Sequence, residues 1–245
     1  MTSSETSSGD PGAGNPDLPE TQGLALGTLR EKLSRLDDPA ERTRWGAALL
    51  DDPRAGARAL GQRLQRRILA EAAEAERLRG LFEYRGKLFE QGCQAVAGVD
   101  EVGVGPLAGP VVAAAVVLPR EVDLPGLNDS KKLSAKARER LDEAIREQAL
   151  AFCVAEISPE EIDRINILQA TLEAMRKSVS GLSEQVSPDH VLVDARKIPG
   201  LSIPQTALVH GDAIDGSIAA ASIVAKVHRD GLMRRLADEF PGYGL

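Results

Sequence analysis

Residues 95–118 read AVAGVDEVGVGPLAGPVVAAAVVL, and this stretch decides the fold class. Its two apolar runs, Ala95–Val102 and Val111–Leu118, have the length and the valine content of buried strands. Glycine and proline separate the runs and favour a turn between them. The turn residues are Gly103, Gly105, Pro106 and Gly109. The stretch therefore predicts two neighbouring strands of a sheet.

Downstream of this pair, apolar runs alternate with amphipathic ones, which is typical of an α/β domain. Ser134 is a good N-cap for the first predicted helix. The predicted helices are Ser134–Leu150, Pro159–Leu182 and Ser217–Glu239, and the further predicted strands are Ala151–Ile157, His190–Asp194 and Thr206–Val209. We therefore expect an α/β domain over residues 93–245.

Upstream, the composition changes twice. Residues 1–22 are rich in Ser, Gly, Pro and Glu and poor in large apolar side chains, so we expect a disordered tail. Residues 23–92 are rich in Leu, Ala, Arg and Glu, with apolar residues near the helical spacing. This pattern predicts a helical extension of two or three helices, interrupted at Asp51-Asp52-Pro53 because proline disfavours helix in the residue before it.

Composition narrows the class of protein. The 245 residues are 42% hydrophobic and carry a net charge of -7, with no long apolar span and no signal segment, which predicts a soluble cytoplasmic protein. Cys93 and Cys153 have no partner at metal-ligand spacing, so we expect both to be buried and reduced. The acidic balance disfavours a nucleic-acid partner unless carboxylates gather around divalent cations.

Four carboxylates lie at predicted strand ends or just before a helix: Asp100, Glu101, Asp194 and Asp212. Side chains at the ends of strands in an α/β sheet face a crevice, so these residues could form one site. Clustered carboxylates repel one another unless cations with oxygen ligands, such as Mg²⁺ or Mn²⁺, neutralise them. The alternative is a solvated strand end. Because adjacent strand residues point to opposite faces, Asp100 and Glu101 require the strand to end or bend there.

Four blocks of sequence carry a family resemblance. They are AGVDEVGVGPLAGPV at 97–111, LNDSKKLS at 127–134, VLVD at 191–194, and the Gly-Asp pair at 211–212 that leads into IAAASIVAKVHRD at 218–230. Together they resemble the signature of the ribonuclease HII family over residues 95–245. The resemblance implies a ribonuclease H-like fold, a mixed five-stranded sheet flanked by helices, and the N-terminal helices loosely resemble an extension that some bacterial members carry.

The resemblance also implies site residues. Asp100, Glu101, Asp194 and Asp212 match the family's metal-binding carboxylates. Asp230 is the rival for the fourth place, but a helix over residues 217–230 would put it about 20 Å from the helix start. We therefore choose Asp212 and expect Asp230 to pair with Arg229 or Arg234, or to lie on a solvated helix face. The residues that match substrate-binding positions are Gly103, Val104, Gly105, Ser130, Lys131, Lys132 and Ser222; alternatively, the lysines are only solvated surface.

The implied activity is that of an endonuclease with Mg²⁺ or Mn²⁺, which hydrolyses the RNA strand of RNA–DNA hybrids and incises 5′ of ribonucleotides embedded in duplex DNA. We expect a monomer with roles in ribonucleotide excision repair and DNA replication. Two departures favour an alternative, a catalytically impaired protein that binds nucleic acid or a partner. Val104 replaces the arginine of the family's Gly-Arg-Gly motif, and we expect the family's C-terminal segment to be missing, because the chain stops at Leu245 where the family continues.

Overall fold

The computed structural model describes residues 18–243, which divide into two compact units between Ala75 and Glu76. The expected disordered tail falls largely on residues 1–17, outside the described residues. Thr21, at the end of that expected tail, is buried, and its hydroxyl donates to Asp52 Oδ2 at 2.7 Å. The described end of the expected tail is therefore packed against its own unit.

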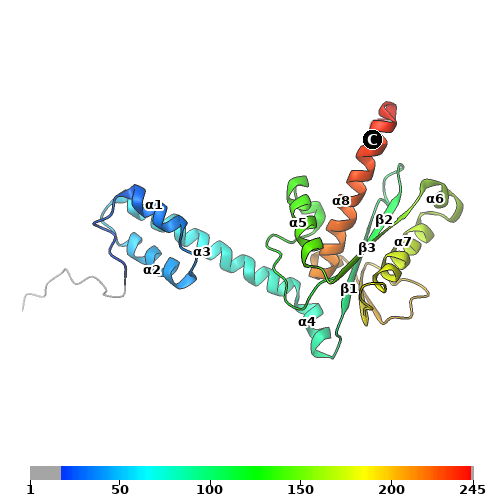
Figure 1. Ribbon diagram of the computed structural model, residues 1–245, viewed down its shortest axis with the longest axis horizontal. Coiled ribbons are helices and arrows are strands. Elements are labelled where there is room, and N and C mark those ends of the chain that lie inside the picture. The colour runs from blue at the N-terminus through cyan, green and yellow to red at the C-terminus, as the bar shows by residue number, and fades with distance from the viewer. Residues whose placement is uncertain (1–17, 244–245) are drawn as a thin grey trace, which may run out of the picture. The chain divides into compact units, whose positions relative to one another are not determined.

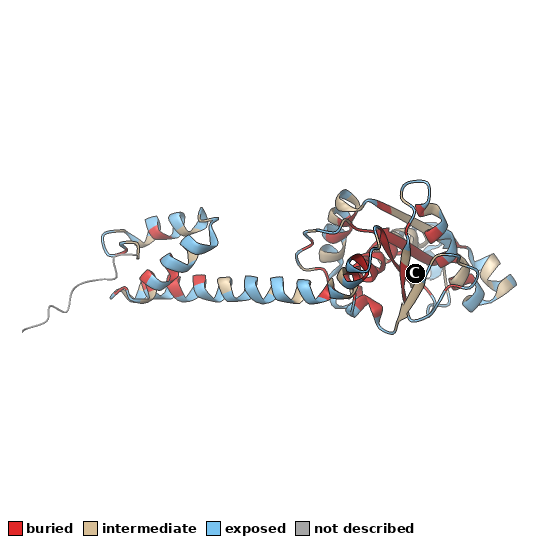
Figure 2. Cartoon of the chain, turned by 90° about the horizontal axis from the view of Figure 1, so that it is seen from below, coloured by how far each residue is buried: buried red, intermediate tan, exposed pale blue. Residues whose placement is uncertain are grey.

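The first unit is helical. It contains α1 (Leu26–Ser34), α2 (Pro39–Leu50) and the first part of α3 (Ala55–Leu81). The expected interruption at Asp51-Asp52-Pro53 is confirmed, since these residues separate α2 from α3. The core of the unit consists of the buried side chains Leu29, Trp45, Leu49, Ala57, Leu60 and Leu64. Most of α3 beyond this core is exposed (Figure 2).

The second unit is built on a five-stranded sheet in the order β3-β2-β1-β4-β5 (Figure 1). The strands are β1 (Val96–Val102), β2 (Val111–Val117), β3 (Ala151–Ile157), β4 (His190–Asp194) and β5 (Gln205–Leu208). The pairs β1–β2 and β2–β3 are antiparallel, whereas β1–β4 and β4–β5 are parallel. The predicted mixed sheet flanked by helices is therefore confirmed.

Helices cover both faces of this sheet. On one face, α7 (Ile167–Leu182) packs against Ala97 and Val99 of β1. On the other face, α8 (Gly216–Glu239) and α5 (Ala135–Gln148) bury the alternate side chains of β2. The backbone of β1 and α8 come very close, since a Cβ added at Gly98 would lie 2.1 Å from the Ser217 carbonyl carbon. Glycine at this position therefore sets the separation between sheet and helix.

Two predictions about helices need correction. The single helix expected over residues 159–182 is two helices, α6 (Pro159–Ile165) and α7, because Asn166 adopts a left-handed backbone with φ of 70°. Its side chain then caps α7, accepting from Gln169 N at 3.1 Å. The N-terminal region has four helices instead of two or three, the fourth being α4 (Glu83–Glu90).

The two compact units meet inside α3, while the expected domain junction between residues 92 and 93 stays a prediction. Leu88 and Phe89 of α4 pack against Val96, Leu192 and Ile218 of the sheet unit, so the division falls inside α3. The predicted N-cap at Ser134 is confirmed, since its hydroxyl accepts from Ala137 N at 3.3 Å.

Two predictions about side chains and membranes can also be compared with the structure. Cys93 and Cys153 are both free thiols, but they are partly buried instead of fully buried. Among residues 18–243, every helix is too short or too polar to span a bilayer.

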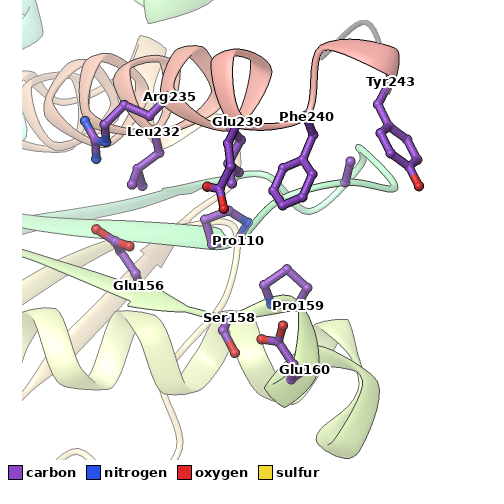
Figure 3. A pocket seen from close by; sticks show the side chains of 13 residues that line it. Pro110, Glu156, Ser158, Pro159, Glu160, Leu232, Arg235, Glu239, Phe240 and Tyr243 are labelled. Atoms are coloured by element: carbon purple, nitrogen blue, oxygen red, sulfur yellow. The ribbon is translucent and has the colours of Figure 1, made fainter.

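A pocket of about 850 Å³ in the second unit lies between the start of β2, the end of β3 and the last turns of α8 (Figure 3). Phe240 and Tyr243, next to and within a short 3-10 helix (Pro241–Tyr243), line one side of it. Glu156, Glu160 and Glu239 also line it, so its charge does not suit a phosphate backbone. None of the predicted site residues lines this pocket.

Candidate metal centre

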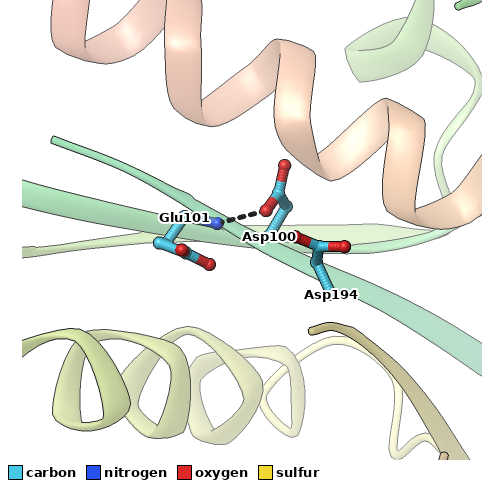
Figure 4. A group of neighbouring side chains, drawn as sticks. All are labelled: Asp100, Glu101 and Asp194. Carbon is cyan, nitrogen blue, oxygen red and sulfur yellow. Dashed lines mark hydrogen bonds between the residues drawn. The ribbon is translucent and has the colours of Figure 1, made fainter. Parts of the chain in front are cut away.

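Three of the predicted carboxylates converge where β4 ends. One oxygen from each of Asp100, Glu101 and Asp194 lies within 4.8 Å of the others (Figure 4). The parallel pairing of β1 with β4 stops at Val99 and Val193, so the edge of β1 beyond this point is open. Asp194, the last residue of β4, faces that open edge.

The strand β1 continues through the Asp-Glu pair and ends one residue later, at Val102, which is the predicted bound. Asp100 and Glu101 stay in register with Ala114 and Ala113 of β2. Their side chains point to opposite faces, Asp100 toward α8 and Glu101 toward α7 (Figure 4). Both carboxyl groups nevertheless approach Asp194. The strand β4 ends at that residue, so no further part of β4 lies between the two faces of the sheet.

The fourth predicted carboxylate, Asp212, lies beside this group without belonging to the three converging oxygens. It sits in a short 3-10 helix (Gly211–Ala213), after His210 in a left-handed conformation with φ of 58°. Gly211 N donates to Asp194 Oδ1 at 2.6 Å, which fixes the turn against β4. We call Asp100, Glu101, Asp194 and Asp212 the carboxylate cluster.

The cluster is electrostatically strained without cations. Burial, together with the charges of Glu101 and Asp194, raises the pKa of Asp100 well above its usual value, and a hydrogen bond from Ser222 opposes the rise. Burial and the Asp194 charge raise the pKa of Glu101. Burial and the charge of Asp129 raise the pKa of Asp212. All three carboxyl groups would ionise more readily beside a positive charge.

Two oxygens of the cluster have unused acceptor capacity. Glu101 Oε2 and Asp212 Oδ2 are buried, and neither has a hydrogen-bond partner among residues 18–243. Lys131 Nζ is the nearest cation to Asp212 Oδ2, at 3.6 Å, which is too long for a hydrogen bond. Since hard divalent cations prefer oxygen ligands, Mg²⁺ or Mn²⁺ fits this donor set.

The predicted Ser-Lys-Lys residues form a 3-10 turn (Ser130–Lys132) beside the cluster. The hydroxyls of Ser130 and Ser222 are 2.9 Å apart and both residues are buried, so they tie this turn to α8. The side chains of Lys131 and Lys132 are exposed, with Lys132 Nζ 3.9 Å from Asp129 Oδ2. The lysines are therefore free to reach an anionic ligand.

The predicted glycine tripeptide lies in the segment that joins β1 to β2. Gly103 has φ of 99°, and a Cβ there would lie 2.5 Å from Arg229 Nε. Val104 is 42% exposed, and Gly105 faces open space. Arg229, which is buried, donates from Nε to the Pro110 carbonyl at 2.9 Å and from Nη2 to the Ala108 carbonyl at 2.8 Å. Arg229 therefore holds the loop at its far end.

Sequence reasoning missed three residues that shape this site. Asp129 raises the pKa of Asp212, and the one signal that could have shown its role is its place in the LNDSKKLS block. Arg138 donates to the carbonyls of Ser130 and Leu133 and so supports the lysine turn. Arg229 holds the glycine loop across a long separation in sequence, which no local pattern indicates.

Asp230 has other partners than we expected. Its carboxylate pairs with Lys226 Nζ at 2.5 Å and Arg138 Nη2 at 3.7 Å, whereas neither Arg229 nor Arg234 bonds to the carboxylate. One turn back along a helix places Lys226 on the same face as Asp230, and α5 brings Arg138 beside it. Asp230 thus belongs to the support of the lysine turn.

Comparison with known proteins shows matches to one family in both parts of the chain. The family model of Ribonuclease HII matches residues 97–245, and that of the Ribonuclease HII N-terminal domain matches residues 27–88. Ribonuclease HII of Myxococcus xanthus is 55% identical over 81% of this chain and 67% of that relative. Ribonuclease HII of an Anaeromyxobacter species is 52% identical over 81% of this chain, which spans 62% of that relative's length.

The fold has solved counterparts. The crystal structure of ribonuclease H2 from Pyrococcus horikoshii OT3 aligns with a TM-score of 0.53 and 29% identity, covering 61% of this chain and 78% of that one. The shared sheet thus accompanies shared sequence over the region that holds the carboxylate cluster. The chain belongs to the ribonuclease HII family, whose members are hydrolytic endoribonucleases of the ribonuclease H type.

Proposed function

We propose that this chain is an endonuclease that hydrolyses the RNA strand of RNA–DNA hybrids and incises duplex DNA on the 5′ side of an embedded ribonucleotide. One observation carries the proposal: the buried carboxylate of Asp100 and the partly buried carboxylates of Glu101 and Asp194 converge beside Asp212, and Glu101 Oε2 and Asp212 Oδ2 have no hydrogen-bond partner among residues 18–243. A pair of divalent cations is the ligand that such a donor set favours.

We propose Asp100, Glu101, Asp194 and Asp212 as the residues that hold Mg²⁺ or Mn²⁺. When bound, such ions lower the pKa of water and neutralise charge that develops on a phosphate. Without them the raised pKa values of Asp100, Glu101 and Asp212 favour the protonated carboxyl groups, which are poor ligands. Metal binding and ionisation of the cluster should therefore occur together.

The residues around the cluster would bind and orient the nucleic acid. Lys131 and Lys132 offer exposed ammonium groups to backbone phosphates. Ser130 and Ser222 hold the lysine turn against α8, so their direct role is positioning. The backbone at Gly103, Val104 and Gly105 is the proposed reader of the ribose 2′-hydroxyl, the group that distinguishes RNA from DNA.

A second candidate rests on Val104, which supplies no charge at the tripeptide's central position. This candidate is a family member that binds nucleic acid or a partner protein without turnover. Its binding surface would be the same cluster, so binding alone does not separate the two candidates. Incision does.

The deciding experiment incubates the protein with Mg²⁺ or Mn²⁺ and a labelled DNA duplex that contains one ribonucleotide. We expect a single nick 5′ of that ribonucleotide and loss of the nick in Asp100→Asn. Asp163→Asn, which changes an exposed carboxylate of α6 in the same way, is the matched control and should keep full activity. Binding without incision by the unaltered protein would favour the second candidate.

Location, assembly and cellular role extend the proposal further. We propose a cytoplasmic monomer that acts in ribonucleotide excision repair and DNA replication, because these are the settings in which ribonucleotides occur within DNA. Sedimentation of the purified chain, alone and with a hybrid duplex, tests the monomeric state. A stable dimer in both samples would contradict it.

A further inference from the structure

Arg196 lies next to the carboxylate cluster, on the side that faces α7. Together with Glu101, Val104, Leu168 and Asp194 it lines a pocket of about 300 Å³, which we call the α7-side pocket. Apolar side chains of α7 form the floor of this pocket. Arg196 is the one basic residue among those that line it.

The backbone holds Arg196 in place although its side chain is exposed. Ala195 adopts a left-handed conformation with φ of 57°, and its amide donates to the Leu208 carbonyl at 2.9 Å. Arg196 N donates to the Asp194 carbonyl at 2.6 Å. This tight turn fixes the base of the side chain directly after a residue of the cluster.

The guanidinium group has no protein partner within the described chain, residues 18–243. The hydrogen bond that Arg196 donates there comes from its backbone amide, and the residue is exposed. Its charge nevertheless reaches the cluster, since it lowers the pKa of Glu101 against the larger effect of burial. A free guanidinium beside a pocket is a strong donor for an anion, because its planar fork matches two oxygens of a phosphate.

Positive charge therefore stands on two sides of the cluster. Lys131 lies on the α8 side, 3.6 Å from Asp212 Oδ2, and Arg196 lies on the α7 side beside Glu101. A nucleic-acid strand carries one phosphate per roughly 3.4 Å of helix rise. A strand whose phosphate sits at the cluster would thus present its neighbouring phosphates toward Lys131 and toward Arg196.

We propose that Arg196 binds the backbone phosphate next to the one held at the carboxylate cluster, and that it supplies the positive charge which Val104 does not offer in the same pocket. This assignment rests on the proposed nuclease function and adds a substrate-binding residue to it. Val104 and Arg196 come from different strand ends, β1 and β4, yet line one pocket, so either position can place a cation there.

The test compares three single variants in binding and in turnover. Arg196→Gln removes the charge and keeps most of the length, Arg196→Lys keeps the charge, and Lys197→Gln is the matched control. Lys197 is also exposed and adjacent, but it does not line the pocket. Fluorescence anisotropy in Ca²⁺, with a gel to check that the duplex stays intact, gives the dissociation constant of an RNA–DNA hybrid over a range of KCl concentrations.

We expect Arg196→Gln to weaken hybrid binding about tenfold and to reduce the slope of log affinity against log salt by about 1, the value for one lost phosphate contact. In Mg²⁺ its KM should rise about tenfold while kcat changes less than twofold. Arg196→Lys should stay within about threefold of the unaltered protein, and thermal unfolding of all variants should agree because the exposed guanidinium has no protein partner.

Rescue makes the test specific to the pocket. Adding Val104→Arg to Arg196→Gln should restore most of the lost affinity and the salt slope. Equal effects of Arg196→Gln and Lys197→Gln would overturn the proposal, as would a salt slope that does not change. If the unaltered protein binds the hybrid but does not incise it, the nuclease function fails while the anisotropy comparison still decides the role of Arg196.

Discussion

Replacing Arg229 should both destabilise the second unit and loosen the glycine loop. The side chain is buried, and it donates to two loop carbonyls, Ala108 O at 2.8 Å and Pro110 O at 2.9 Å. Arg229→Ala removes both hydrogen bonds from a charged donor, leaves both carbonyls without this donor and empties space beside Gly103. Hydrogen bonds to charged groups contribute about 1.5–3 kcal/mol each, and they do not add fully, so we expect a loss of about 3–5 kcal/mol.

The loss can be measured as a shift in melting temperature. For a unit of this size, 1 kcal/mol corresponds to about 2–4 °C, so Arg229→Ala should melt about 6–20 °C lower. Scanning calorimetry measures the shift, and fluorescence of Trp45, the only tryptophan, identifies the transition of the first unit. The melting temperature of Arg229→Lys should lie between those of the unaltered protein and Arg229→Ala, because one ammonium group cannot reproduce the planar fork of the guanidinium.

The matched control is Arg235→Ala, since Arg235 is an exposed arginine of the same helix. Surface substitutions of this kind stay within about 0.5 kcal/mol. If Arg229→Ala melts within about 1 °C of Arg235→Ala, the buried guanidinium does not hold the loop and our reading of the two hydrogen bonds is wrong. If Arg229→Ala is destabilised but its KM for a hybrid is unchanged, the loop does not depend on this anchor for binding.

Three further results are expected. Gly98→Ala should cost more than about 3 kcal/mol in urea unfolding, because a Cβ 2.1 Å from the Ser217 carbonyl carbon meets backbone that cannot move alone; a loss below 1 kcal/mol would contradict this. Ser222→Ala should weaken Mn²⁺ binding by about 10–100-fold, as measured by calorimetric titration, since Ser222 contacts both Asp100 and Ser130. Unchanged affinity would exclude a supporting role. In EDTA the second unit should become less stable as pH rises from about 4 toward neutrality: the raised pKa values of Asp100 and its neighbours make the folded state bind more protons than the unfolded chain. Thermal unfolding at pH 5 and pH 7.5 measures this loss of stability, and excess Mn²⁺ should abolish the difference between the two pH values.

Strand positions followed from sequence because they depend on short-range patterns. The expected bounds Ala151–Ile157 and His190–Asp194 match β3 and β4, since apolar runs flanked by polar residues define strands locally. The break at Asn166 did not follow, because a left-handed asparagine in an otherwise helical pattern has no marker in the neighbouring residues. The order of strands depends on long-range pairing and was not predicted, since the family resemblance implied only a mixed five-stranded sheet.

The candidate site divides in the same way. The four residues of the carboxylate cluster could be predicted only with the family resemblance, because acids at strand ends also occur on solvated surfaces, and their role as metal ligands remains a proposal to be tested. The route by which Asp100 and Glu101 reach one site was not predictable, since it depends on β4 stopping at Asp194 while β1 continues. Arg196 has no mark in the sequence that distinguishes it from other surface cations, because residues far apart in the chain form its pocket.

The helix α8 contacts several of these separate parts and so fixes the distances between them. Near its start Ser217 lies against Gly98 of β1, Ser222 contacts Asp100 and Ser130 of the lysine turn, and Arg229 and Asp230 reach the glycine loop and Arg138. Because a helix advances about 1.5 Å per residue, the seven residues from Ser222 to Arg229 fix the two supports about 10 Å apart. A rigid spacing of this kind suits a site that must hold both cations and a nucleic-acid strand, whose phosphates repeat at a fixed distance. If separate loops carried the two supports, the distance between them would vary. Glycine is needed at position 98 for the same reason. Any side chain there would displace α8, and the residues of α8 that support the carboxylate cluster and the glycine loop would move with it.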